Sequence, residues 1–121
     1  MQYMLLIYDD PSTWSGMSEG DRNAVMGEYF QFTEDLTKAG KHVAGDALQP
    51  TSTAKSVRVR DGSSETTDGP FAETKEALGG YYLVDVDSEE EALEWAARIP
   101  SARFGTIEVR PVVVFPVEAT A

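Results

Sequence analysis

Two helical patterns, each lying between short apolar stretches, constrain the fold of this 121-residue chain more than any other feature. The first begins at Ser18 and ends at Gly40, and apolar or aromatic side chains recur along one of its faces. The second begins at Ser88, which together with Glu91 has the spacing of a capping box, and it ends at Pro100. The residues predicted to face the core are Val25, Tyr29, Phe32 and Leu36 in the first helix and Ala92, Trp95, Ala96 and Ile99 in the second.

The apolar stretches around these helices are typical of strands. Tyr3–Tyr8 is a continuous apolar run with no room for a helix before Pro11, which predicts a strand buried on both faces. Asp61 and Gly62 form a hairpin-type turn signal, and Pro111 indicates an edge or a bend in the last strand. Further strands are predicted over His42–Leu48, Ser56–Arg60, Gly79–Val86 and Gly105–Phe115.

The order of these elements predicts an α+β domain. Strand, helix and strand are followed by a strand-rich insertion from Gln49 to Leu78, and then by strand, helix and strand again. This is the split βαβ order of ferredoxin-like domains, with an inserted hairpin. Two helices cover only one face of an antiparallel sheet, so we expect a homodimer that packs sheet against sheet. A single domain over residues 1–117 with a frayed tail over residues 118–121 is predicted.

Charge and composition argue against several classes of partner. The chain has 21 acidic and 10 basic residues, and its net charge of -11 repels nucleic-acid phosphates and anionic lipid head groups. The amino terminus lacks signal-peptide features, and the longest apolar runs are far shorter than the roughly 20 residues that span a bilayer. Cysteine is absent, His42 is the only histidine, and no nucleotide-binding glycine fingerprint is present. We therefore expect a cytoplasmic protein with no metal or cofactor, and with no direct contact to nucleic acid or membrane.

A loop from Thr67 to Glu76 places several carboxylates and a lysine around one phenylalanine. Its Asp-Gly-Pro-Phe segment, Asp68–Phe71, is followed by Gly79–Tyr82 and then by Glu108–Pro111. With Gly45–Leu48 after the first helix, this order of segments resembles the DGPF-type members of the YCII-related (YciI-like) family, over nearly the whole chain. The resemblance implies a ferredoxin-like fold of the dimeric α+β barrel group. Because many bacterial relatives are encoded beside extracytoplasmic-function sigma factors, it also implies a functional link to a sigma-factor pathway.

The chain departs from the family at one functional position. Shorter YciI-like relatives carry a histidine in the first helix, and an aspartate before a Pro-Phe segment after the second helix, proposed as an acid-base pair. Here Tyr29 lies about where the histidine would fall, and the segment after the second helix reads Ile99-Pro100. The pair is therefore not carried over, and catalysis would have to use other groups.

The predicted catalytic residues are Asp68, Glu73 and Lys75. Asp68 precedes Gly-Pro, a stiff turn that directs its carboxylate, and we expect Phe71 to anchor this turn in the core. A carboxyl group desolvated against Phe71 would suit general acid or base work. The alternative is that Asp68 only caps the turn, and that the glutamates and lysine of the loop form a solvated face.

The predicted ligand-binding residues are Tyr29, Phe71, Tyr82 and Arg110. Tyr29 either is buried with its hydroxyl paired or lines a cavity beneath the sheet. Tyr81 and Tyr82 lie on opposite faces of their strand, so only one of them can meet a ligand. Arg110 shares a strand face with Glu108, and the two either form an ion pair or hold a small anion.

Two functional classes remain open. The first is a dimeric module that binds an unidentified small molecule or a protein. The second is a cofactor-independent enzyme of the lyase or isomerase type, which transfers protons on a small organic substrate; this class rests on analogy with the fold group.

Overall fold

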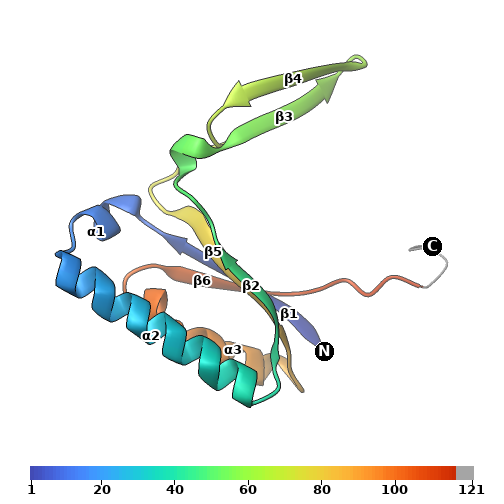
Figure 1. Ribbon diagram of the computed structural model, residues 1–121. Coiled ribbons are helices and arrows are strands. Elements are labelled where there is room, and N and C mark those ends of the chain that lie inside the picture. The colour runs from blue at the N-terminus through green and yellow to red at the C-terminus, as the bar shows by residue number, and fades with distance from the viewer. Residues whose placement is uncertain (117–121) are drawn as a thin grey trace.

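A four-stranded antiparallel sheet and two long helices form the body of the protein in the computed structural model, which describes residues 1–116 (Figure 1). The strand order is β2-β5-β1-β6, with every neighbouring pair antiparallel. This confirms an α+β domain and is compatible with a ferredoxin-like fold. The predicted tail over residues 118–121, and the predicted end of the domain at residue 117, lie outside the described residues. The strands are β1 (Gln2–Asp9), β2 (His42–Ala47), β5 (Ala77–Asp85) and β6 (Thr106–Pro111).

The two long helices are α2 (Glu19–Lys38) and α3 (Glu89–Arg98), and both lie on one face of the sheet (Figure 1). The hydroxyl of Ser18 accepts from the backbone N–H of Asp21 at 3.1 Å, which confirms the predicted start of α2. The hydroxyl of Ser88 likewise accepts from the N–H of Glu91 at 3.1 Å. The carboxylate of Glu91 turns back to the N–H of Asp87, one residue earlier than a capping box requires. No helix within residues 1–116 combines the length and apolarity needed to cross a bilayer.

The short helix α1 (Pro11–Ser15) is not predicted from the sequence, where Pro11 indicates only the end of the first strand. Proline is favoured in the first turn of a helix, where its missing N–H is not needed. The carboxylate of Asp10 caps the helix by accepting from the N–H of Ser12 at 2.9 Å. Helix α1 turns the chain from the end of β1 toward α2 (Figure 1).

The core lies between the sheet and the two long helices. Phe32 of α2 connects these layers: its ring meets that of Tyr82 at 5.0 Å between centroids and that of Trp95 at 5.9 Å, both edge to face. Burial alternates along β1, since every second residue from Tyr3 to Asp9 is buried and the residues between are half-buried. The prediction that this strand is buried on both faces is therefore wrong for a single chain, because the helices cover only one face.

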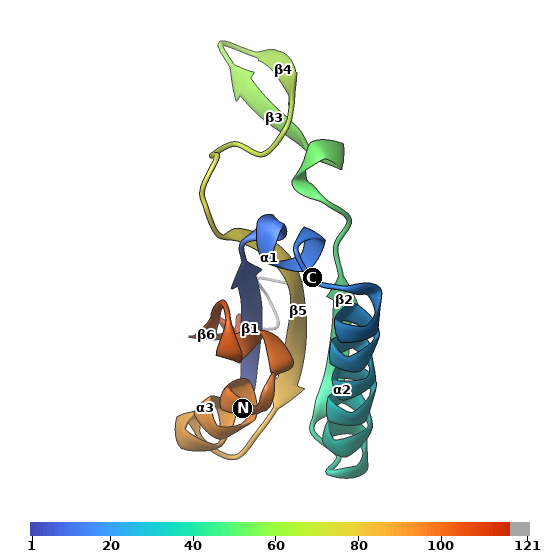
Figure 2. The same ribbon diagram turned by 90° about the vertical axis from the view of Figure 1, so that its left-hand side faces the viewer.

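The insertion forms a separate hairpin that projects from the body (Figure 2). It consists of a short 3-10 helix η1 (Thr51–Thr53), then β3 (Lys55–Arg60) and β4 (Ser63–Asp68). Asp61 and Gly62 both have positive φ, 51° and 79°, which is the geometry of the predicted tight turn. The apolar residues of the hairpin, Val57 and Val59, are exposed because no other part of the described chain covers them.

Candidate functional site

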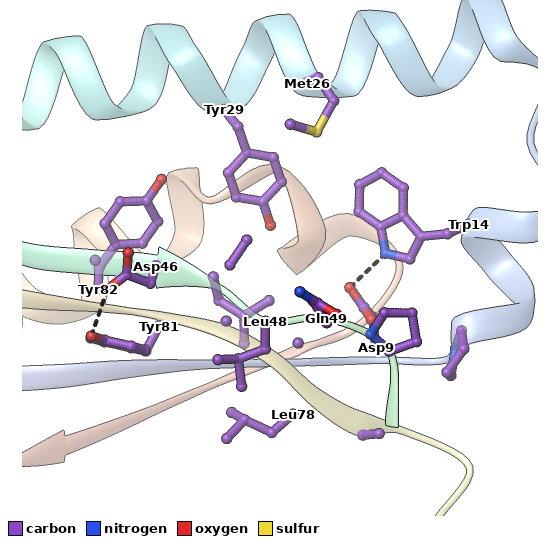
Figure 3. A pocket seen from close by; sticks show the side chains of 18 of the residues that line it. Asp9, Trp14, Met26, Tyr29, Asp46, Leu48, Gln49, Leu78, Tyr81 and Tyr82 are labelled. Atoms are coloured by element: carbon purple, nitrogen blue, oxygen red, sulfur yellow. Dashed lines mark hydrogen bonds between the residues drawn. The ribbon is translucent and has the colours of Figure 1, made fainter. Parts of the chain in front are cut away.

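A cavity of about 670 Å³ lies between α2 and the sheet, near the end of β1 (Figure 3). Residues of α2 form one wall, residues of β2 and β5 form the other, and α1 contributes at one end. The volume is in the range of small-molecule sites, which are mostly apolar and carry a few placed polar groups. The main apolar and aromatic lining residues are Ile7, Trp14, Met26, Tyr29, Phe30 and Tyr82.

A buried carboxylate, that of Asp9, lines this cavity. Asp9 is the last residue of β1 and only 7% exposed. Its Oδ2 accepts a hydrogen bond of 2.8 Å from Nε1 of Trp14, as Figure 3 shows. The indole of Trp14 is held in turn by an edge-to-face contact with Phe104, at 5.6 Å between centroids. Asp9 and Trp14 therefore form a supported polar pair at one end of a largely apolar cavity.

Tyr29 reaches into the cavity from α2 (Figure 3). Its hydroxyl is hydrogen-bonded to the hydroxyl of Ser101, a fully buried residue of the short 3-10 helix η2 (Pro100–Arg103). Burial raises the pKa of the Tyr29 hydroxyl, the bond to Ser101 offsets part of the rise, and the nearby carboxylate of Asp9 adds to it. The phenol therefore stays protonated at neutral pH. The two alternatives considered for Tyr29 are both observed, since its hydroxyl is hydrogen-bonded and its ring lines the cavity.

Tyr82 also faces α2, where its hydroxyl and that of Thr33 are hydrogen-bonded at 2.8 Å. Burial raises the pKa of Tyr82, so this phenol too is neutral. Tyr81 leaves β5 on the opposite face, and its hydroxyl donates to the carboxylate of Asp46 at 2.9 Å. The alternation predicted for these two tyrosines is confirmed, and Tyr82 is the one whose ring packs in the core beside the cavity.

Two of the glycine-containing segments singled out in the sequence shape the cavity wall. Strand β2 passes close over Tyr82, since a Cβ added at Gly45 would lie 2.8 Å from Cδ1 of that ring. A Cβ at Gly80 would lie 3.0 Å from the carbonyl oxygen of Asp46. Gly79 is different, because a Cβ there would make an ordinary 3.5 Å contact with Oδ1 of Asp9. Gly45 and Gly80 are thus needed for close approach of the neighbouring strand, whereas a Cβ is tolerated at Gly79 beside the carboxylate.

The Asp-Gly-Pro-Phe loop lies away from this cavity. Phe71 is 83% exposed, so the prediction that it anchors the turn in the core is wrong. The physical reason is that the hairpin projects from the body and no core lies beneath its base (Figure 2). Phe71 borders only a smaller pocket of about 260 Å³ on the hairpin, together with Arg58 and Glu65.

The three predicted catalytic residues are not brought together within the described chain. Asp68, exposed at the end of β4, pairs with Lys55 across the hairpin. No hydrogen bond or ion pair of residues 1–116 joins Asp68, Glu73 and Lys75 to one another, and none of the three lines the larger cavity. The neighbouring Glu76 instead ties the loop to β6, by accepting from the hydroxyl of Thr106 at 2.9 Å.

Replacing Asp68 by asparagine is expected to change the melting temperature by no more than about 3 °C, because water screens an ion pair as exposed as Asp68–Lys55. Thermal unfolding followed by circular dichroism measures this effect. Asp61→Asn, in the turn of the same hairpin, is the matched control. A much larger drop for Asp68→Asn alone would mean that the carboxylate is desolvated by a surface outside this chain.

Arg110 lies on the sheet face opposite the helices and forms an ion pair with Glu108 of the same strand. Of the two roles considered for Arg110, the ion pair is confirmed, and the cavity lies on the other side of the sheet. His42 borders the cavity, with its ring 6.1 Å from that of Tyr82. Within residues 1–116, no three His, Asp or Glu side chains are grouped in a way that could hold a metal ion.

Asp9 and Trp14 were missed by sequence analysis, although a signal for Asp9 exists. The alternation of β1 places Tyr3, Leu5 and Ile7 on the buried face, and Asp9 is the next residue in that series. An acidic residue at an inward position of a strand needs a buried partner or a function. Trp14 carries no comparable signal, because its position depends on the short helix α1.

Comparison with known proteins agrees with this arrangement of elements. The model of the YCII-related domain matches residues 1–116, which include every residue of the cavity. A protein of Rhizobium meliloti (strain 1021), described as uncharacterized, is 38% identical over 117 residues, covering 95% of this chain and 94% of the relative. Because the family model matches nearly the whole chain, the chain belongs to the YCII-related family.

Proposed function

We propose that this protein is a dimeric small-molecule-binding module of the bacterial cytoplasm, and that the cavity beneath α2 is its ligand site. The observation that carries the proposal is a cavity of about 670 Å³ with one nearly buried carboxylate, that of Asp9, in a mostly apolar and aromatic wall. Small-molecule sites combine these two features, since the apolar wall supplies affinity and the few polar groups fix orientation. The order of the family motif segments supports the link to a sigma-factor pathway.

Ligand binding is tested by blocking the cavity without unfolding the protein. Gly79→Val places a larger side chain beside Asp9, where a Cβ has room, so the variant should fold and lose ligands. We expect phenols, lactones, amines or carboxylates that fit the cavity to raise the melting temperature of the wild type. A ligand at 100 times its dissociation constant stabilises a protein by about 2.7 kcal/mol.

Thr66→Val, on the exposed hairpin, is the matched control and should respond to ligands as the wild type does. If no compound of any of these classes stabilises the wild type, the cavity is not a ligand site. Equal stabilisation of the wild type and Gly79→Val would place the binding site elsewhere.

The dimer is proposed because the helices cover only one face of the sheet and leave the other face open. Met4, Leu6 and Tyr8 point to that face from β1 and remain half-buried, and Leu83 joins them from the neighbouring strand. A contiguous apolar surface of this kind is typical of a protein interface. A second copy of the chain can cover it by packing sheet against sheet, with about 800 Å² buried on each partner in a standard interface.

Leu6→Lys is expected to convert the dimer to a monomer at micromolar concentration, because the charge would lie unpaired in the centre of the interface. Size-exclusion chromatography with light scattering measures the mass. Leu93→Lys, on the exposed side of α3, is the control and should leave the dimer intact. A Leu6→Lys variant that remains dimeric would show that the sheet face is not the interface.

Acid-base catalysis is the second candidate function, and one observation favours it. The cavity brings the carboxylate of Asp9 near the neutral phenol of Tyr29, and the carboxylate adds to the rise in the pKa of that phenol. A carboxylate base and a phenol donor are the two groups needed to move a proton on a bound substrate. If the wild type turns over a bound ligand, and Tyr29→Phe still binds that ligand but does not turn it over, the protein is an enzyme. If the wild type binds the ligand without turnover, the protein is a binding module.

A further inference from the structure

The charge arrangement of the cavity indicates which head group its ligand carries. We propose that the cavity takes an organic ammonium, a protonated amine on an apolar body, with the amine bonded to the free carboxylate oxygen of Asp9. The inference rests on the proposed ligand-binding function and adds the charge and chemical class of the ligand. Four observations carry it: the open oxygen of Asp9, the absence of an ion pair to it within the described residues, the net negative charge of the chain, and the aromatic walls.

The first observation concerns the two oxygens of the Asp9 carboxylate. Oδ2 accepts from the indole of Trp14, whereas Oδ1 accepts no hydrogen bond from any described residue. Among residues 1–116, no side-chain oxygen or nitrogen is both fully buried and without a partner. Oδ1 therefore retains access to a solvent-sized probe, and it lies beside Gly79, itself a cavity-lining residue. A ligand in the cavity can donate to this oxygen.

The second observation concerns the charge that would balance Asp9. A carboxylate removed from water is costly unless it is paired with a cation. None of the ion pairs formed within the described part of the chain includes Asp9, and its one donor, Trp14, is neutral. Arg22 also borders the cavity, but its Nη1 donates to the carbonyl oxygens of Met17 at 2.7 Å and of Trp14 at 3.4 Å. A positively charged ligand would balance the charge that the protein leaves unpaired.

The surrounding field favours a cation as well. Asp46 of β2 also borders the cavity, but its exposed carboxylate is bonded to the hydroxyl of Tyr81 on the opposite face of the sheet. The chain carries a net charge of -11, and such a field concentrates cations and repels anions at a cleft. An anionic ligand would have to overcome the carboxylate of Asp9 and this net charge, with Arg22 as its cationic partner.

The aromatic walls suit the same ligand. The rings of Trp14 and Tyr29 face the cavity from α1 and α2, near the carboxylate of Asp9 (Figure 3). Aromatic faces attract ammonium groups through their quadrupole, most strongly where water is excluded. The phenol of Tyr29 is neutral and tied to Ser101, so it adds no competing charge. The remaining apolar wall would bury the body of the ligand.

The test compares three probes that share one body and differ in head group: phenethylamine, phenethyl alcohol and phenylacetate. Isothermal titration calorimetry at pH 7 measures their affinity for the full chain. We expect the amine to bind at least about tenfold more tightly than the alcohol, and the carboxylate to bind more weakly still. Asp9→Asn should remove the preference for the amine, whereas Asp61→Asn, in the distant hairpin turn, should retain it.

A second variant keeps the test valid if Asp9→Asn does not fold. Gly79→Ala retains the carboxylate and adds one methyl group beside Oδ1, in ordinary contact, and should weaken the amine more than the alcohol. Equal binding of amine and alcohol to the wild type would overturn the ammonium proposal while leaving the cavity a ligand site. Tighter binding of phenylacetate would also overturn it and assign the head group to Arg22. Failure of all three probes overturns the ammonium proposal, and only failure of the wider ligand screen as well would overturn the proposed function.

Discussion

Replacing Gly105 by alanine is expected to lower the free energy of unfolding by more than about 2 kcal/mol. A Cβ at this position would lie 2.3 Å from the carbonyl oxygen of Tyr8 and 3.0 Å from Cβ of Asp9. Both atoms belong to β1, an inner strand of the sheet, so no rotation of a flexible side chain relieves the overlap. Urea denaturation followed by tryptophan fluorescence measures the loss.

The matched control is Gly27→Ala in α2, where a Cβ would meet no atom within 4 Å. Alanine is favoured over glycine inside a helix, so this variant should gain about 0.5–1 kcal/mol. A loss of stability in Gly105→Ala and a gain in Gly27→Ala would distinguish the steric effect of a close backbone contact from the effect of glycine on backbone entropy. If Gly105→Ala were as stable as the wild type, the close approach of β1 to residue 105 would be wrong.

Replacing Phe32 by alanine is expected to lower the free energy of unfolding by about 3–5 kcal/mol, because it leaves a cavity where α2, α3 and the sheet meet. Phe32 is only 3% exposed, and its ring contacts Tyr82 of the sheet and Trp95 of α3. Because α2 forms one wall of the ligand cavity, a loosened α2 should also weaken any ligand found for the wild type. Urea denaturation and calorimetric titration measure the two effects.

Phe30→Ala is the control for this change, since Phe30 lies on the same helix and is 71% exposed. We expect it to alter the free energy of unfolding by less than about 0.5 kcal/mol. Because Phe30 borders the cavity, it can still change ligand affinity without changing stability. Similar losses of stability for both variants would contradict the position of Phe32 between the layers.

Much of the fold could be predicted because its signals are local. The start of α2 at Ser18 depends on a hydroxyl and an N–H three residues apart, and the left-handed end at Gly40, with φ of 74°, depends on one residue type. The hairpin turn at Asp61 and Gly62 is local in the same way. The last strand was predicted too long, because β6 ends at Pro111; beyond it the N–H of Val112 still donates to the carbonyl oxygen of Gln2 at 3.0 Å, but the strand goes no further.

The candidate site was predicted only in part, since its residues are distant in sequence. Tyr29 and Tyr82 were predicted to bind a ligand, and both line the cavity. Asp68 and Phe71 were predicted as site residues because charged side chains and an aromatic ring lie together in one loop. Such a loop does not show by its sequence whether a core packs beneath it. Asp9, a single acid at the end of an apolar strand, is the carboxylate that becomes buried.

The sequence by itself determined the two long helices, most strands, the hairpin turn, the acidic charge and the family, because these follow from short-range spacing and composition. Only the tertiary structure decided which acid is desolvated. The fold brings the end of β1, helix α1 and the middle of α2 together around one cavity, and it holds the Asp-Gly-Pro-Phe loop at the base of a projecting hairpin. Burial of a side chain depends on what packs over it, and for Asp9 and Asp68 that is set by segments far away in the chain.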